Sequence, residues 1–120
     1  MAEGRVRKAA RSAGKRTERR WAALLGGKRI PSPGRASRDM DVVYPLCVEM
    51  KHRKEKMPQW VRDGLAQAEA DALPNEIPIY IRHDKGDHWS NDVVMMTGRS
   101  FMRILRTVGV KVRWADGEDE

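Results

Sequence analysis

The 120-residue sequence contains very little cysteine and no long apolar run. Cys47 is its only cysteine, which excludes an intrachain disulfide and a cysteine-rich zinc site. It lies between Leu46 and Val48, so we expect a buried small hydrophobic residue and not an exposed thiolate. No stretch approaches the roughly 18 apolar residues of a membrane helix, and the basic N-terminus lacks the apolar core of a signal peptide. These absences favour a cytoplasmic protein with no membrane contact.

Acidic residues and large apolar side chains are scarce in the first 38 residues. This stretch has twelve Lys and Arg residues against only Glu3 and Glu18, whereas residues 39–120 have twelve against fifteen acids. The formal net charge of +7 is therefore concentrated at one end. Such polarity favours a nucleic-acid partner, because each neutralised phosphate releases counterions. The alternative is a solvated basic tail without a dedicated ligand.

The first half of the chain predicts one helix and three strands. Residues 14–25 place Trp21, Leu24 and Leu25 on one helical face, and the glycines at 26 and 27 end the helix. Strands are predicted at 28–30, 41–44 and 46–51. The last two form a tight hairpin around Pro45, which cannot donate to a strand ladder and so marks a turn or bulge.

The second half predicts two helices and two strands. Residues 54–74 have a helical period with Pro58 in the first turn. A strand at 76–83 places Ile77, Ile79 and Ile81 on one side, and a further strand covers 93–97. The final helix, 98–108, carries one apolar face formed by Phe101, Ile104, Leu105 and Val108. The order α–β–β–β–α–β–β–α predicts an α/β fold, a mixed sheet flanked by helices. We expect a flexible basic arm (1–12), one domain (13–114) and an acidic tail (115–120).

The predicted hairpin brings Asp41 beside Glu49 and Lys51. Glu49 and Lys51 are two residues apart on a strand and share a face, while the Met50 side chain points into the core. Two carboxylates and a backbone carbonyl suit Mg²⁺, for which Mn²⁺ is a plausible substitute. A neighbouring lysine stabilises charge that develops on a phosphate. This set therefore predicts metal-dependent hydrolysis of phosphodiesters without a small-molecule cofactor. The alternatives are a turn cap at Asp41 and a surface ion pair between the other two.

Asp41, a gap of seven residues and then Glu49-Met50-Lys51 resemble the motif of PD-(D/E)xK nucleases. The stretch "KRTERRW" is similar to the glutamate-bearing helix of that superfamily, with Glu18 as the further acidic residue. "RIPSPGRASRDMDVV" resembles the strand, loop and aspartate of archaeal-type Holliday junction resolvases. The resemblance covers about residues 14–107, although Met40 stands where the motif has proline. It implies a restriction-endonuclease-like fold, catalytic roles for Glu18, Asp41, Glu49 and Lys51, and metal binding by Glu18, Asp41, Glu49 and Met50.

The resemblance also implies a homodimer that resolves four-way DNA junctions, because symmetric incision needs two active sites. Residues 93–105 are the candidate interface, and the small size suits a prokaryotic or phage-infected cell. The alternatives are another endonuclease of the superfamily, restriction-like or involved in repair, and a non-catalytic basic DNA-binding protein. Gln67 and His52 are further possible site residues. The expected contacts to branched or duplex DNA are Arg5, Arg7, Lys8, Lys15, Arg16, Arg19, Lys28, Arg29, Ser32, Arg35, Arg38, Arg53, Lys54 and Lys56.

Overall fold

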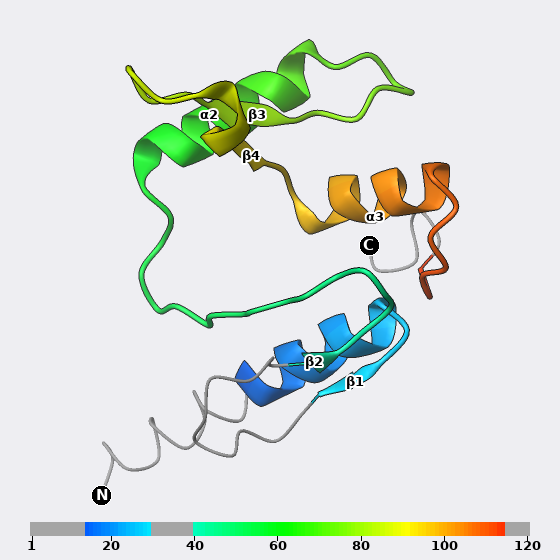
Figure 1. The fold of residues 1–120 in the computed structure, drawn as a ribbon. Helices are drawn as coiled ribbons and strands as arrows, with labels where there is room; N and C mark the ends of the chain where they lie inside the picture. Colours follow the sequence, from blue (N-terminus) through cyan, green and yellow to red (C-terminus); the bar gives the residue numbers. More distant parts are fainter. Residues whose placement is uncertain (1–13, 30–39, 115–120) are drawn as a thin grey trace, which may run out of the picture. The chain divides into compact units, whose positions relative to one another are not determined.

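The computed structural model describes residues 14–29 and 40–114 (Figure 1). The chain divides into two compact units, described separately below. The first unit comprises residues up to 54 and from 110 onward, and the second comprises residues 55–109. The elements are a first helix (14–24), β1 (Lys28–Arg29), β2 (Met40–Asp41), α2 (Gln59–Asp71), β3 (Tyr80–Arg82), the 3-10 helix η1 (Trp89–Asn91), β4 (Val93–Met95) and α3 (Gly98–Thr107).

The first helix ends at the glycine pair, as the sequence predicts. The Gly26 N–H donates to the Ala23 carbonyl (3.1 Å) and the Gly27 N–H donates to the Ala22 carbonyl (2.8 Å). Gly26 has a φ of +75°, which completes a Schellman motif that only a residue without a Cβ adopts readily. The chain then enters β1, which pairs antiparallel with β2 so that Lys28 lies opposite Asp41.

The core of the first unit lies where this helix meets β2. Ala22, Leu25 and Met40 are each no more than 1% exposed. Burial of their apolar surface stabilises the contact by roughly 25 cal/mol per Å². Just beyond β2, the Val43 N–H donates to the Leu25 carbonyl (3.0 Å). The end of the first helix is therefore held to the strand that carries Asp41.

Residues 43–52 run along the described part of the first helix, from its C-terminal end back to Gly14. The start is fixed by the Val43–Leu25 hydrogen bond. At the other end, a Cβ placed on Gly14 would lie 3.4 Å from the His52 Cβ. Between them, a cis Tyr44–Pro45 bond lies in a turn in which the Leu46 N–H donates to the Val43 carbonyl (3.0 Å). Pro45 therefore marks a turn, as predicted.

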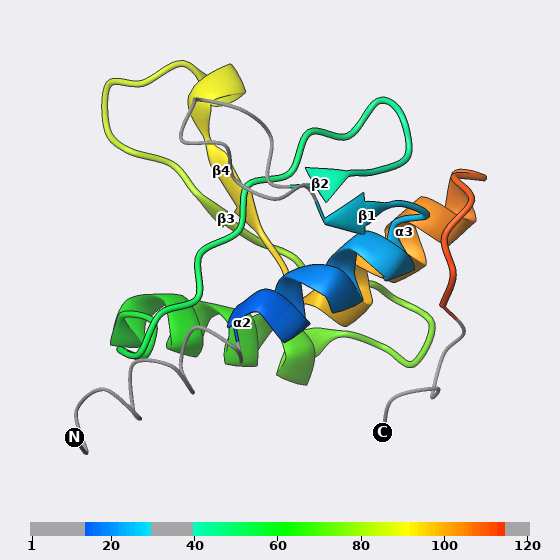
Figure 2. The same ribbon diagram turned by 90° about the horizontal axis from the view of Figure 1, so that it is seen from below.

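The second unit places α2 against a short antiparallel hairpin of β3 and β4 (Figure 2). Tyr80 faces Met95 and Arg82 faces Val93 in the register of the hairpin. The Tyr80 ring lies 6.4 Å from the Trp60 ring, centroid to centroid. The Arg82 guanidinium lies 4.3 Å from the centre of the Trp60 ring, a cation–π contact. The helix approaches closely because Gly64 lies under Tyr80, where a Cβ would overlap the ring.

We expect Gly64→Ala to destabilise the second unit by about 1–2 kcal/mol, because the added methyl group displaces Tyr80. In a Tyr80→Ala background the same change is expected to stabilise it by up to about 1 kcal/mol, since alanine favours the helix once space exists. Urea unfolding of the four variants measures this coupling. Additive effects of the two substitutions would contradict the contact.

The last helix, α3, is capped at its N-terminus by Thr97, whose Oγ1 accepts a hydrogen bond from the Ser100 N–H (3.3 Å). Its buried side chains are Ser100, Met102 and Leu105. Phe101 and Ile104 are half-buried. The predicted apolar face is therefore wrong at Val108, which is 67% exposed. This residue lies beyond the last full turn, beside Gly109 with a φ of +83°.

Two predicted strands are wrong. Residues 42–44 leave the ladder after Asp41, because the turn through Pro45 has no proline N–H to offer a neighbouring strand. Residues 46–51 do not pair with any strand of the two sheets. The predicted hairpin with residues 41–44 therefore does not form. Cys47 is exposed and not buried as expected. It falls on the outer side of a segment whose burial alternates residue by residue.

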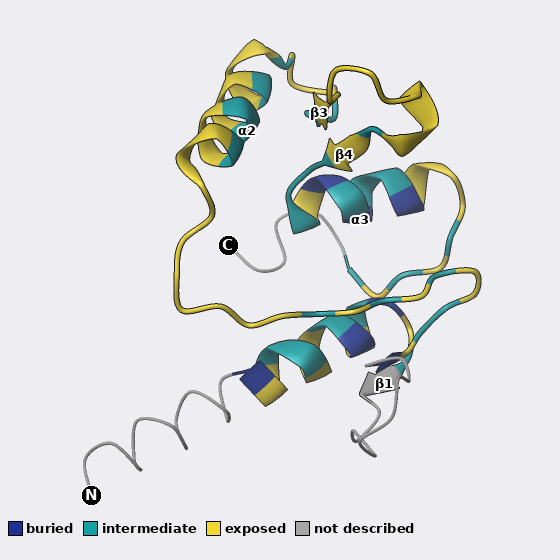
Figure 3. Cartoon of the chain, turned by 60° about the vertical axis from the view of Figure 1, so that its left-hand side comes forward, coloured by how far each residue is buried: buried dark blue, intermediate teal, exposed yellow. Residues whose placement is uncertain are grey.

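The mixed α/β character of the chain is confirmed, but the single flanked sheet is not observed. The described residues form two separate two-stranded antiparallel sheets, β1–β2 and β3–β4. The strand predicted at 76–83 is shortened to β3, and Ile79 and Ile81 are 42% and 51% exposed. Figure 3 shows how much of the second unit's hairpin and α2 is exposed. No helix in residues 14–29 and 40–114 has the length and apolar character needed to cross a membrane.

Candidate functional site

Glu49 and Lys51 lie side by side on the exposed face of residues 46–51. Along this segment Leu46, Val48 and Met50 are half-buried, and the residues between them are exposed. The Lys51 Nζ lies 3.7 Å from the Glu49 Oε1, and the two side chains are 67% and 75% exposed. The predicted shared face is therefore confirmed. An ion pair this exposed adds about 0–1 kcal/mol to stability, so both charges remain accessible to a ligand.

Asp41 lies at the end of β2, beside the glycine pair that ends the first helix. Its side chain is exposed, and its carboxylate forms no hydrogen bond or ion pair with the part of the chain that the structure describes. The absent hairpin has a direct consequence for the site. Asp41 lies near the C-terminal end of the first helix, whereas Lys51 precedes His52, which lies beside Gly14, the first residue of that helix that the structure describes.

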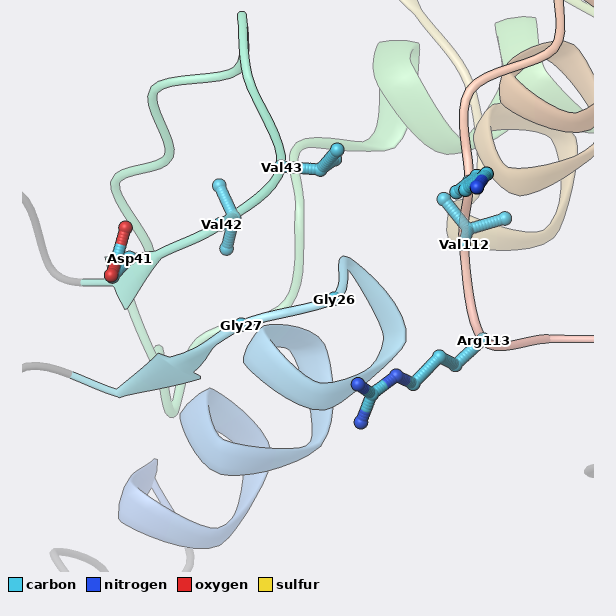
Figure 4. A pocket seen from close by; sticks show the side chains of 8 residues that line it. Gly26, Gly27, Asp41, Val42, Val43, Val112 and Arg113 are labelled. Carbon is cyan, nitrogen blue, oxygen red and sulfur yellow. The ribbon is translucent and has the colours of Figure 1, made fainter.

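A pocket of about 470 Å³ opens beside Asp41 (Figure 4). The C-terminal segment forms one wall, because the Arg113 N–H donates to the Leu24 carbonyl (2.9 Å) and holds that segment to the end of the first helix. Lys111 and Arg113 are exposed, with half-buried Val112 between them. The pocket is lined by Gly26, Gly27, Asp41, Val42, Val43, Lys111, Val112 and Arg113.

Sequence reasoning did not assign Lys111 or Arg113 to a site. The available signal was the alternation of "KVR", which places both cations on one side of an extended segment. Nothing local indicates that this segment returns to the helix that precedes β1. Lys111 and Arg113 come to line the same pocket as Asp41 through the hydrogen bond between Arg113 and Leu24.

The remaining predicted residues are distributed over both units. Glu18 is half-buried on the first helix, and Gln67 is exposed on α2, where its Nε2 donates to Asp71 (3.0 Å). The exposed predicted DNA contacts of the first unit are Lys15, Arg16, Arg19, Arg53 and Lys54, and Lys56 is exposed in the second unit. The possible site residue His52 is exposed as well. Arg5, Arg7, Lys8, Ser32, Arg35 and Arg38 lie outside the described residues, as do the side chains of Lys28 and Arg29.

The donor types near Asp41 and Glu49 fit a hard divalent cation. Carboxylates and a backbone carbonyl, here of Met50, are oxygen ligands that Mg²⁺ prefers. Within the described ranges, no three His, Cys, Asp or Glu side chains are already gathered around one point. The predicted carboxylate ligands Glu18, Asp41 and Glu49 are therefore not gathered around one point in the described residues.

Comparisons of the chain with protein-family models, with curated proteins and with solved structures give no match. The resemblance to PD-(D/E)xK nucleases thus stays a prediction from the motif residues.

Proposed function

We propose that this protein is a metal-dependent, structure-selective DNA endonuclease that resolves four-way junctions. The observation that carries the proposal is the exposed Glu49–Lys51 pair, with its 3.7 Å separation. It belongs to the same compact unit as Asp41 and Glu18. A carboxylate and an ammonium group on one open face are the elements needed to hold a cation and a phosphate together.

Each residue has a distinct part in the proposed reaction. Asp41 and Glu49 bind the cation together with the Met50 carbonyl, and Glu18 is the further acidic ligand. Lys51 donates a hydrogen bond to the phosphate and stabilises the charge that grows there during hydrolysis. Mg²⁺ bound at this place would polarise the phosphodiester and activate the attacking water.

The three proposed carboxylate ligands are not gathered around one point in the described residues, so the site has to close. Residues 46–51 already have the alternating burial of a strand, and closure requires them to approach β2. Two carboxylates repel each other unless a cation lies between them. The approach of Glu49 to Asp41 is therefore expected to depend on Mg²⁺ and on the DNA.

The DNA partner and the homodimer follow from charge and symmetry. Lys15, Arg16 and Arg19 are exposed on the helix that carries Glu18, where they can neutralise phosphates. Two symmetric cuts require two copies of the site. In the proposed interface at 93–105, Met102 and Leu105 are already buried within the chain, which leaves the exposed Val93 and Val94 for a partner copy.

The test is a cleavage assay with a synthetic four-way junction and a linear duplex of the same sequence. We expect Mg²⁺-dependent cutting of the junction and no cutting in EDTA, with binding that weakens steeply as salt rises. Equal cutting of both substrates would favour a restriction-like or repair endonuclease. Tight, salt-sensitive binding without cutting in Mg²⁺ or Mn²⁺ would contradict the proposal and favour a non-catalytic DNA-binding protein.

A further inference from the structure

The pocket beside Asp41 combines basic and apolar residues in its lining. Its volume of about 470 Å³ lies within the range of roughly 300–1,000 Å³ typical of ligand pockets. Lys111 and Arg113 supply two positive charges against the single carboxylate of Asp41. Val42, Val43 and Val112 supply an apolar wall. A ligand that combines an anionic group with a compact, partly apolar body matches this lining.

Backbone contacts bring the walls of the pocket together. A Cβ on Gly27 would overlap the Asp41 carbonyl, so the glycine pair lets the helix end and β2 approach as closely as they do. The Arg113 N–H is held by the Leu24 carbonyl (2.9 Å). Figure 4 shows the Arg113 side chain extending from the C-terminal segment toward the end of the first helix. The backbone at Arg113 is therefore fixed beside the helix end, so less backbone entropy is lost there when a ligand binds.

We propose that this pocket binds one nucleotide of the DNA strand, with its phosphate on Lys111 and Arg113 and its deoxyribose against the three valines. The proposal rests on the nuclease function inferred above and adds to it. Asp41 stands at the same pocket, so the bound nucleotide is adjacent to the phosphodiester that is cut. The two cations would thus position the strand, and no catalytic role is assigned to them.

A purely structural role makes a different prediction. The last carbonyls of a helix carry partial negative charge, and a nearby cation stabilises the helix. If Lys111 and Arg113 served only this purpose, their loss would lower stability without changing DNA binding. The two roles are separated by measuring binding and unfolding on the same variants.

The experiment uses the full chain with Lys111→Gln and Arg113→Gln combined. Binding to a four-way junction is measured in EDTA, where nothing is cut, over a series of salt concentrations. We expect roughly tenfold weaker binding at moderate salt, and a slope of log affinity against log salt that falls by about one, as for one lost phosphate contact. The matched control is Arg62→Gln with Lys85→Gln, which removes the same charge from exposed positions of the second unit.

DNA binding, its salt dependence and the unfolding midpoint together separate a nucleotide site from a structural role. A loss specific to the pocket variant, with an unchanged unfolding midpoint, supports the nucleotide site even if the wild-type protein fails to cut. Equal losses in both double variants would show a general charge effect and overturn the proposal. An unchanged salt slope, or a lowered midpoint with unchanged binding, would overturn it while wild-type cutting still upholds the nuclease. Absence of DNA binding by the wild-type protein would overturn both.

Discussion

Glu49→Gln is expected to lower metal-dependent cutting of a four-way junction by about 10³-fold or more, because a neutral amide replaces a charged metal ligand. Glutamine keeps the shape of the side chain. Since Glu49 is 75% exposed and its ion pair with Lys51 spans 3.7 Å, the fold is expected to tolerate the change. Junction binding in EDTA should stay within about twofold, or tighten slightly as repulsion from phosphates is removed.

The comparison set for Glu49 separates metal binding from general charge effects. Glu69→Gln removes an exposed carboxylate from α2 and should leave the cutting rate unchanged. Asp41→Asn should match Glu49→Gln, because both remove a proposed ligand of one cation. Lys51→Gln should slow cutting by about 10²–10³-fold while the dependence on Mg²⁺ concentration stays the same, since lysine acts on the phosphate. Normal cutting by Glu49→Gln would exclude this residue from the site.

Gly27→Ala is expected to destabilise the first unit by about 2–4 kcal/mol. The new methyl group would overlap the Asp41 carbonyl and lie 2.9 Å from the Val42 Cα. Both are backbone atoms, which cannot rotate away as a side chain can. The pairing of Lys28 with Asp41 would have to shift, and Asp41 would move with it. Cutting should therefore fall together with stability.

The matched control is Gly14→Ala, whose Cβ would lie 3.4 Å from the nearest atom, the His52 Cβ. This substitution should change the free energy of unfolding by less than about 1 kcal/mol. Urea unfolding followed by circular dichroism gives the midpoints, and hydrogen exchange at residues 22–29 locates the effect in the first unit. A midpoint for Gly27→Ala equal to that of Gly14→Ala would contradict the close approach of Gly27 to β2.

The local features of both units follow directly from residue patterns. The 3.6-residue period predicts the first helix, α2 and α3. The glycine pair predicts the end of the first helix, and Gly26 has a φ of +75° there. Period-two alternation identifies the shared face of Glu49 and Lys51. These features depend on residues within one or two turns of each other, so a short stretch of sequence is enough to predict them.

Local residue patterns establish the helices, the charge asymmetry and the side-by-side placement of Glu49 and Lys51. Long-range packing sets the position of residues 46–51 outside the sheets, the exposure of Cys47, and the pocket that Lys111 and Arg113 line with Asp41. Pairing of strands and docking of distant segments depend on hydrogen bonds between residues far apart in the chain, which no short sequence window contains. The backbone hydrogen bond from Arg113 to Leu24, for example, is not predicted by any local sequence pattern.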